Sequence, residues 1–300
     1  MVCIGAFDGL HRGHRALVGR ARDRADALGL PAVALSFEPL PREYFSAHEP
    51  PPRLTLPRAK FEGLCALGMD AVGLLRFDAT MAAMDATAFV ERVLVKQLQA
   101  REVWVGPDFQ FGNRRRGDLA LLRELGAIHG FAADAIAPVH GPDGRVSAST
   151  IRAQLAAGDL DGAARGLGRR YSIAGRVVRG RQLGRRLGYP TANLRLVGKR
   201  PALGGIFAAW VHGVGPSPRA AVASLGTRPT VFGVEPLLEA HLFDFDGDLY
   251  GQRIEVEFVA KLRDELKFDD LPALVRQMDL DSTQARDALR HDTERCGAMA

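Results

Sequence analysis

Short apolar runs alternate with helix-like segments through the first half of the chain. The runs lack polar alternation, which is typical of strands buried on both faces of a sheet. They lie at residues 2–7, 32–37, 71–77, 102–106 and 132–139. The segments between them have the apolar spacing of helices, and they lie at residues 13–28, 57–67, 85–99 and 117–128. Strands that alternate with helices predict an α/β domain with a parallel, doubly wound sheet.

The pattern changes after Gly168. Later segments between residues 171 and 262 carry apolar runs, several with polar alternation, and Gly- and Pro-rich turns separate them. This arrangement favours antiparallel pairing in a barrel or sandwich. A last helical pattern covers residues 271–290. We therefore predict two domains, residues 1–168 and residues 169–300.

Composition restricts the class of protein. Of the 300 residues, 47% are apolar and 25% are charged, the profile of a soluble globular chain. No apolar run reaches the length of a membrane span, and the start of the chain lacks the basic segment of a signal peptide. Cys3, Cys65 and Cys296 are far apart and indicate reduced thiols. We therefore expect a cytoplasmic protein with no membrane partner.

The net charge of +5 fits a protein that binds nucleic acid and equally one that binds polyphosphates. The arginines are dispersed, with short clusters such as Arg114 to Arg116. Neither aromatic interleaving nor a zinc finger accompanies them. We therefore expect small-molecule partners and no nucleic acid, and the sequence shows no obligate protein partner.

A glycine- and histidine-containing string, GAFDGLHRGH, spans residues 5–14 between the first strand and the first helix. Open sheets bind ligands at the carboxyl ends of their strands, and a helix start attracts phosphate. His11 and His14 are three positions apart, so on a helical turn they point the same way and can donate to phosphates. The alternatives are a helix start with exposed histidines, or a zinc pair that lacks further ligands at useful spacing.

A second glycine-rich string, GRQLGRRLGYPTANL, spans residues 180–194 between two predicted strands. Its glycines permit close folding over phosphates, an arginine supplies charge, and a proline fixes the approach to Thr191. Thr191 and Asn193 offer neutral oxygens that suit Mg²⁺. The alternative is a β-turn closed by Asx and Thr hydrogen bonds.

Transfer of a phosphoryl group to a hydroxyl also requires a carboxylate near that hydroxyl. Glu239 is the candidate, in the predicted strand LLEAHLFDF. Strand alternation places Leu237, Glu239 and His241 on one face. The alternative is an ordinary solvent-exposed glutamate.

The string at residues 5–14 resembles the H-x-G-H signature of the nucleotidyltransferase superfamily, in the form found in its FAD synthetase branch. Residues 36–45, 105–117 and 146–152 agree with the same branch. The resemblance implies a Rossmann-like nucleotidyltransferase domain, in which His11 and His14 are catalytic. It implies ATP contacts from Gly5, Phe7, Asp8, Gly9, His11, His14, Ser147, Ser149 and Arg152, and FMN or FAD contacts from Phe37, Pro39, Pro41, Asp108 and Phe109. Taken alone, residues 146–152 also fit an ordinary helix N-cap.

Residues 180–194 and 238–251 resemble the riboflavin kinase family. That resemblance implies a six-stranded antiparallel Greek-key β-barrel with a C-terminal helix, which binds Mg²⁺-ATP and riboflavin. Glu239 would be the general base, and Thr191 and Asn193 would hold Mg²⁺. ATP contacts are implied for Gly180, Gly184, Arg185, Gly188, Pro190, Thr191 and Asn193, and flavin contacts for Arg228, Arg263 and Glu265.

The order of the two modules resembles that of the bacterial bifunctional riboflavin kinase/FAD synthetase family. The chain is therefore expected to phosphorylate riboflavin to FMN and to adenylylate FMN to FAD, with ATP as co-substrate and release of pyrophosphate. One alternative is a riboflavin kinase with a degenerate first domain. Another is a non-catalytic flavin- or nucleotide-binding regulator.

Four positions depart from the family pattern. Leu40 replaces a usual histidine, Ala148 a usual serine, and Arg179 stands where histidine is common. Met1 lies almost inside the first predicted strand, so either the natural chain begins further upstream or this strand loses an edge neighbour. Three of the departures fall in the first domain, and we expect a weakened or normal adenylyltransferase there.

Overall fold

The computed structural model describes residues 1–46, 48–180, 182–196, 199–230 and 233–297. The chain divides into two compact units. The first comprises Met1–Pro51 with Pro57–Ala148, and the second comprises Pro52–Leu56 with Ser149–Ala300. A division of function after Gly168 stays a prediction.

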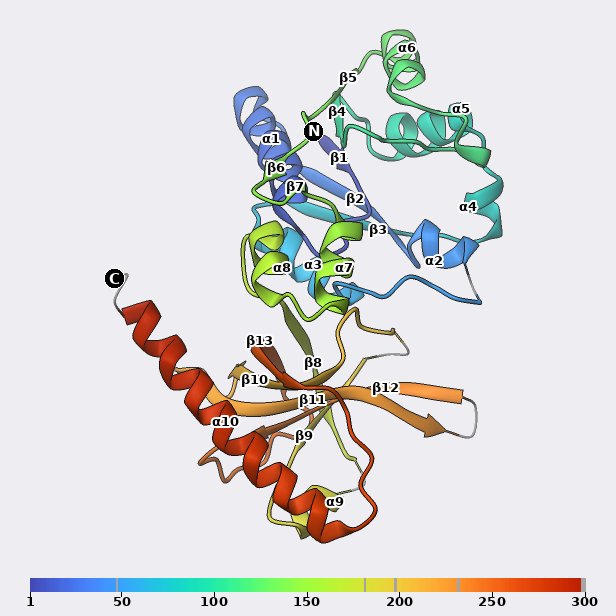
Figure 1. The fold of residues 1–300 in the computed structure, drawn as a ribbon. Coiled ribbons are helices and arrows are strands. Elements are labelled where there is room, and N and C mark those ends of the chain that lie inside the picture. Colours follow the sequence, from blue (N-terminus) through green and yellow to red (C-terminus); the bar gives the residue numbers. More distant parts are fainter. Residues whose placement is uncertain (47, 181, 197–198, 231–232, 298–300) are drawn as a thin grey trace. The chain divides into compact units, whose positions relative to one another are not determined.

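The first unit contains a five-stranded sheet of order β3-β2-β1-β4-β5 with every pair parallel (Figure 1). The strands are β1 (Val2–Ile4), β2 (Val33–Glu38), β3 (Ala71–Arg76), β4 (Glu102–Val105) and β5 (Ala132–Ala135). The parallel sheet predicted from the apolar runs is confirmed. Strand β1 is central, because Cys3 pairs with Ala34 on one side and with Trp104 on the other. It therefore has a neighbour at both edges.

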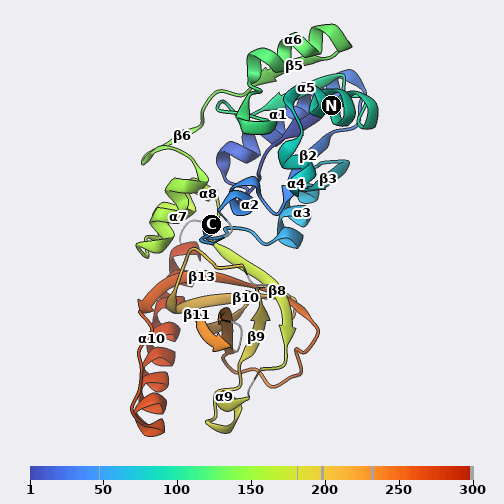
Figure 2. The ribbon, with the colours of Figure 1, turned by 90° about the vertical axis from the view of Figure 1, so that its right-hand side faces the viewer.

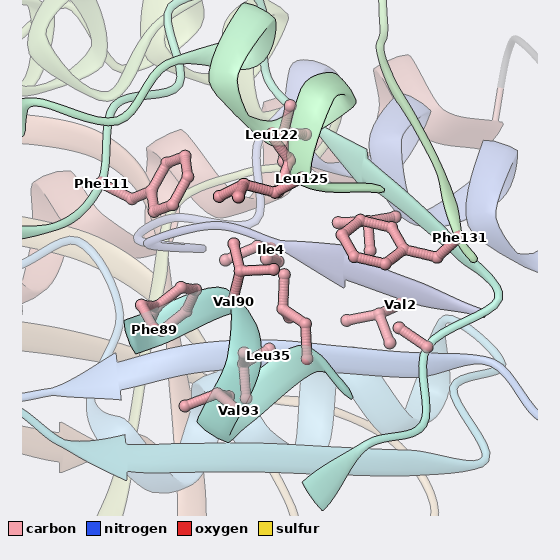
Figure 3. Packing of buried hydrophobic residues seen from close by; sticks show 14 of the residues in the cluster. Val2, Ile4, Leu35, Phe89, Val90, Val93, Phe111, Leu122, Leu125 and Phe131 are labelled. Carbon is pink, nitrogen blue, oxygen red and sulfur yellow. The ribbon is translucent and has the colours of Figure 1, made fainter. Parts of the chain in front are cut away.

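Helices cover both faces of this sheet because residues alternate sides along each strand. Val2, Ile4 and Leu35 point to one side, where they meet α5 (Ala86–Phe89), the π-helix η1 (Val90–Gln97) and α6 (Leu119–His129) (Figure 3). Cys3 and Ala34 point to the other side and pack with residues of α1 (Arg12–Leu28) and α3 (Pro57–Ala66). The doubly wound arrangement is thus confirmed.

Several short elements had no signal in the apolar pattern. They are α2 (Pro41–Phe45), α4 (Ala79–Ala83), the 3₁₀ turn η2 (Asn113–Arg115), β6 (His140–Gly141) and β7 (Gly144–Arg145). The segment expected to be one helix at residues 85–99 changes from α to π winding at Val90. These short elements bring the loops at the carboxyl ends of the strands into defined positions.

Besides Pro52–Leu56, the second unit contains α7 (Ala148–Ala156) from its second residue onward and α8 (Leu160–Leu167), and it continues into a closed, antiparallel six-stranded barrel. The strands are β8 (Ser172–Val178), β9 (Ala192–Arg195), β10 (Gly205–His212), β11 (Arg219–Thr230), β12 (Gly233–Leu242) and β13 (Arg253–Arg263). Strands β10, β11 and β12 are consecutive neighbours and β13 returns beside β10. This is the predicted Greek key.

Helix α10 (Leu271–Gly297) lies along the outside of the barrel (Figures 1 and 2). Its residues Ala285 and Leu289 are buried against Ala208 and Phe243. A one-turn helix, α9 (Leu183–Arg186), lies within the glycine-rich string. In the described part of the chain, no helix combines the length and apolar character needed to cross a membrane.

Candidate functional site

The loop between β1 and α1 has an unusual backbone. Phe7 and Leu10 adopt left-handed φ values of 50° and 47°, and Gly9 has φ 90°. Each non-glycine residue in this region costs about 1–3 kcal/mol, and such strain clusters at functional sites. The turn brings His11 to the N-cap of α1, where its Nδ1 accepts the backbone N–H of His14 at 3.3 Å.

The two predicted histidines lie together. Their rings stack with centroids 3.7 Å apart and planes 18° apart. Because Nδ1 of His11 accepts a hydrogen bond, we assign its proton to Nε2. Nδ1 of His14 is buried and has no hydrogen-bond partner among the described residues.

Burial holds the pKa of His14 well below its ordinary value of 6.5, and the neighbouring His11 and Lys60 lower it further. A buried imidazole near positive charge favours its neutral form. A neutral imidazole on His14, stacked on His11 at the end of the central strand, can offer an N–H group to a phosphate.

A cavity of about 250 Å³ opens at this point. Its walls include Gly5, His11, Gly13, His14, Gly106, Asp108, Phe109, Arg145, Val146, Ser147 and Ala148. Arg145, from β7, forms an ion pair with Asp108. Arg145 was not singled out from the sequence, although it directly precedes the motif at residues 146–152. An anion that enters this cavity meets the guanidinium of Arg145 beside the histidine pair.

A second cavity of about 440 Å³ has aromatic walls. Its lining includes Phe37, Pro41, Phe45, Phe77, Met81, Met84, Phe89, Phe109, Phe111, Arg42, Arg114 and Arg115. Phe109 lines both cavities, so the two adjoin. Stacked and edge-on rings surround the space and suit a flat, largely apolar ligand.

Several of the predicted site residues of the first domain are divided between the two cavities. Gly5, the histidines and Ser147 line the smaller cavity, and Phe37 and Pro41 line the aromatic one. Asp108, predicted to contact flavin, lines the smaller cavity. Pro39 lines neither of these two cavities.

Three predicted ATP contacts lie behind the cavity wall. Phe7 and Asp8 are buried and Gly9 forms the turn. Phe7 packs edge-on against His14 with ring centroids 5.3 Å apart. These residues therefore shape the loop, and direct contact with ATP stays a prediction for them.

The remaining predictions for the first domain concern the motif at residues 146–152. Ser149 and Arg152 belong to the second compact unit, where Nε of Arg152 donates to the Pro52 carbonyl at 2.7 Å. Their contact with phosphate stays a prediction. Of the positions that depart from the family pattern, Ala148 lines the smaller cavity, whereas Leu40 is 4% exposed and lines neither cavity.

In the second unit, a cavity of about 360 Å³ lies beside strands β9 and β12. Leu237, Glu239 and His241 face it, while Leu238 and Ala240 are buried on the opposite face of β12. The predicted alternation is therefore confirmed. One edge of β12 pairs with β9, and this pairing sets Glu239 directly opposite Asn193.

The glycine-rich string supplies the polar side of this cavity. Thr191 Oγ1 donates to Glu239 Oε1 at 3.4 Å, and Asn193 Nδ2 lies 3.4 Å from Thr191 Oγ1. A Cβ at Gly180 would lie 2.5 Å from Asn193 Oδ1, so only glycine leaves room for that amide. Hydroxyl, amide and carboxylate oxygens are the hard ligands that Mg²⁺ accepts, and this donor set fits the ion.

Apolar side chains form most of the remaining wall. They are Leu187, Ile206, Val222, Leu237, Leu266, Phe268, Leu274 and Met278. Tyr189 donates to the carboxylate of Asp279 on α10, and this bond raises the pKa of Tyr189 to about 12. The contact joins the glycine-rich string to the helix across the cavity.

Two predicted flavin contacts, Arg263 and Glu265, also line this cavity. Arg263 makes a bidentate ion pair with Asp281 of α10, at 2.8 and 2.6 Å. The Glu265 carboxylate rests against bare backbone, since a Cβ at Gly226 would lie 1.9 Å from it. Arg228 is the third predicted flavin contact, and its side chain lies outside the part of the chain that the structure describes.

Among the predicted kinase ATP contacts, Gly184, Thr191 and Asn193 line the cavity. The others lie around it. Gly188 makes a turn with φ 88°, Arg185 is exposed on α9, and the Pro190 carbonyl accepts from His241 Nδ1 at 2.8 Å.

The fold and the sites together define a class. The first unit has a parallel sheet with paired histidines at its central strand. The second has a barrel with a carboxylate opposite a glycine-rich string. These features are typical of a chain with two separate ligand sites. The FAD synthetase family model matches residues 1–150, and the riboflavin kinase family model matches residues 167–289.

Relatives of the whole chain carry both modules. A bifunctional riboflavin kinase/FMN adenylyltransferase of Pseudomonas fluorescens is 44% identical over 94% of this chain and 91% of its own length. The protein of the same name from Escherichia coli K12 is 40% identical over 96% and 92%. The chain therefore belongs to the bifunctional riboflavin kinase/FMN adenylyltransferase family.

A solved structure shares the fold. It is described as a macrolide-efflux protein from Streptococcus pneumoniae, with a TM-score of 0.77 and 29% identity over 95% of this chain and 93% of that one.

Proposed function

We propose that this chain phosphorylates riboflavin to FMN in the barrel cavity and adenylylates FMN to FAD in the first unit. The family assignment supports both reactions, and each cavity has the chemistry that its reaction requires. Both reactions consume ATP, and the second releases pyrophosphate.

In the kinase reaction, Glu239 accepts the proton of the riboflavin 5′-hydroxyl as its oxygen attacks the γ-phosphorus of ATP. The bond between that phosphorus and the bridging oxygen of ADP then breaks. The apolar walls of the cavity hold the isoalloxazine ring, and Arg263 and Glu265 flank it. A hydroxyl is a weak nucleophile, so the carboxylate is the group that this reaction most requires.

Thr191 and Asn193 would hold Mg²⁺ beside Glu239, with ATP phosphates and water as its further ligands. When bound, the ion neutralises charge on the phosphates. The glycines of the string, with Arg185 and Pro190, keep the backbone close enough for its N–H groups to reach those phosphates.

In the adenylyl transfer, a phosphate oxygen of FMN attacks the α-phosphorus of ATP, and pyrophosphate leaves. His11 and His14 donate hydrogen bonds to the oxygens on which negative charge develops, and Arg145 attracts the polyphosphate. Phe37, Pro41 and Phe109 hold the flavin ring in the aromatic cavity. Because that cavity adjoins the histidine cavity at Phe109, a bound FMN can extend its phosphate toward the histidines.

The observation that carries the proposal is the direct pairing of Glu239 with Asn193 in one unit and the stacked His11–His14 pair in the other. The test is a time course with purified protein, riboflavin, ATP and Mg²⁺, with flavins separated by chromatography. FMN should appear first and then give way to FAD. FMN that accumulates without FAD would leave a riboflavin kinase with a silent first unit.

The finer assignments form part of the same proposal. We propose that the functional division falls after Gly168, since the riboflavin kinase model begins at residue 167. We place the enzyme in the cytoplasm, where the free thiols of Cys3 and Cys65 would stay reduced. Its partners are ATP and flavins.

A further inference from the structure

A fully buried lysine lies beneath the first candidate site. Lys60, in α3, has a relative exposure of 0%. Lysine is almost never fully buried unless its charge is paired, because removing an ammonium group from water is costly. A buried charge beside a reaction site therefore requires an explanation.

Four oxygen atoms surround the Lys60 ammonium. Its Nζ lies 2.7 Å from a carboxylate oxygen of Glu38, and it donates to Ser36 Oγ and the Phe37 carbonyl at 3.0 Å each. It also donates to the Ala6 carbonyl at 3.4 Å. Ser36 Oγ in turn donates to Ala6 at 3.2 Å, so the contacts form a closed network.

These oxygens come from two segments, the loop after β1 (residues 5–11, the nucleotide loop) and the end of strand β2, which leads into residues 39–45 (the flavin loop). Ala6 precedes the strained turn at Phe7 that leads to the histidines. Phe37 and Glu38 end β2 and begin the segment that contributes Pro41 to the aromatic cavity. Through a single ammonium group, Lys60 therefore joins the nucleotide loop to the strand end from which the flavin loop begins.

Helix α3 meets the nucleotide loop at a second point. A Cβ at Gly63 would lie 2.3 Å from Cδ1 of Leu10. Leu10, a residue of the strained turn, therefore occupies the space that a side chain at position 63 would need. Lys60 and Gly63 are three positions apart and share one face of α3. The helix therefore supports both ends of the turn between Ala6 and Leu10.

We propose that Lys60 is a positioning residue for adenylyl transfer, which holds the nucleotide loop and the flavin loop in the alignment that brings the FMN phosphate to the α-phosphorus of ATP. This role rests on the proposed adenylyl transfer in the first unit. A buried ion pair alone contributes little net stability compared with apolar residues of similar volume. The three further hydrogen bonds, to Ala6 of the nucleotide loop and to Ser36 and Phe37 at the end of β2, are what an alignment role requires.

The test separates alignment from charge pairing. Lys60→Met removes the ammonium and leaves the half-buried carboxylate of Glu38 without Lys60, so this variant alone is expected to be less stable. Lys60→Met with Glu38→Gln removes both charges and restores stability. The matched control is Arg58→Met with Glu62→Gln, which removes an exposed ion pair of 2.7 Å from the same helix.

Each full-length variant is supplied with FMN and ATP, and pyrophosphate release is measured beside riboflavin phosphorylation and thermal unfolding. For the Lys60–Glu38 double variant we expect wild-type riboflavin phosphorylation and a loss of about 10²-fold in FAD formation, the cost of a misplacement of about 1 Å. The loss should fall on kcat rather than on KM, because both loops keep their ligand-binding groups but no longer align them.

A double variant that is stable and forms FAD at the wild-type rate would overturn the proposal and leave Lys60 as the partner of Glu38. A surface control that loses FAD formation equally would overturn it too, since the effect would then belong to α3 as a whole. Failure of the wild-type protein to form FAD would instead contradict the proposed function, whatever Lys60 does.

Discussion

The two proposed sites differ in the side chains at the proposed reacting position. In the barrel, the carboxylate of Glu239 faces the cavity beside Thr191. In the first unit, two stacked imidazoles take this place, and the carboxylate of Asp108 is paired with Arg145. The proposed function explains this difference by the nucleophile of each reaction. A riboflavin hydroxyl must lose a proton, whereas the phosphate of FMN is already an anion and needs only alignment and charge stabilisation.

The two sites also differ in how the backbone supports them. The histidines follow a strained turn, with Phe7 and Leu10 in the left-handed region. Glu239 and Asn193 face each other through ordinary antiparallel pairing. A strained loop requires support from its surroundings, and Lys60 and Gly63 provide contacts there, whereas a strand pair is fixed by its own hydrogen bonds.

The largest expected effect is that of Glu239→Gln on the kinase reaction. The amide keeps the shape but cannot accept the proton, so FMN formation should fall by about 10³-fold while riboflavin binding persists. FAD formation from added FMN should continue at the wild-type rate. Chromatography of flavins measures both reactions.

Glu255→Gln is the matched control for this experiment, because Glu255 lies on the barrel strand β13 and accepts from Ser172 away from the cavity. Unchanged kinase turnover in Glu239→Gln would remove this carboxylate from the mechanism.

The reverse separation is expected for His14→Ala. Loss of a hydrogen-bond donor to the reacting phosphate should lower FAD formation by about 10²-fold. FMN formation in the barrel should remain normal. Pyrophosphate release with FMN as substrate gives the rate, and His129→Ala, at the end of α6, is the control.

A parallel loss of both activities in His14→Ala would show that the two sites are coupled. That result would contradict the expectation that the two sites act independently.

A smaller effect is expected for Arg263→Met, and it concerns stability. Asp281 is 3% exposed, so removal of its bidentate partner leaves a carboxylate with little solvent. The free energy of unfolding of the barrel should fall by about 2 kcal/mol. Addition of Asp281→Asn should restore much of it, as urea unfolding would measure.

If instead Arg263→Met leaves stability unchanged and weakens riboflavin binding, the arginine acts mainly on the flavin. The role of Arg263 would then be the flavin contact predicted from the sequence, and its ion pair with Asp281 would contribute little to stability.

The smallest effect concerns pH and the first unit. The pKa of His14 in the folded chain lies well below 6.5. Below pH 6.5 the unfolded chain therefore binds a proton that the folded chain does not, and stability is lost as the pH falls further. One proton gives a slope of at most about 1.4 kcal/mol per pH unit.

Urea unfolding at several pH values tests this slope. The chain has two tryptophans, so Trp210→Phe leaves Trp104 of β4 as the fluorescent reporter of the first unit. His14→Asn in the same background should flatten the slope. A slope that survives this substitution belongs to another group.

Local patterns predicted much of the architecture. The five apolar runs overlap the five parallel strands, and the central strand β1 is buried at every position, as a run without polar alternation predicts. Alternation along β12 correctly placed Glu239 and His241 on one face. Strand β9 was not predicted from the apolar pattern, because it has only four residues and begins inside the glycine-rich string.

The sequence by itself determined the modules and the chemical groups of this protein. The spacing of His11 and His14 and the identity of Glu239 and Asn193 are local properties, and periodicity fixes which face such residues occupy. Only the tertiary structure decided the partners: Lys60 with oxygens of β2 and of the loop after β1, Arg145 with Asp108, and Arg263 with Asp281. Each of these pairs joins segments far apart in the chain, and their meeting depends on how helices and strands pack rather than on any local spacing.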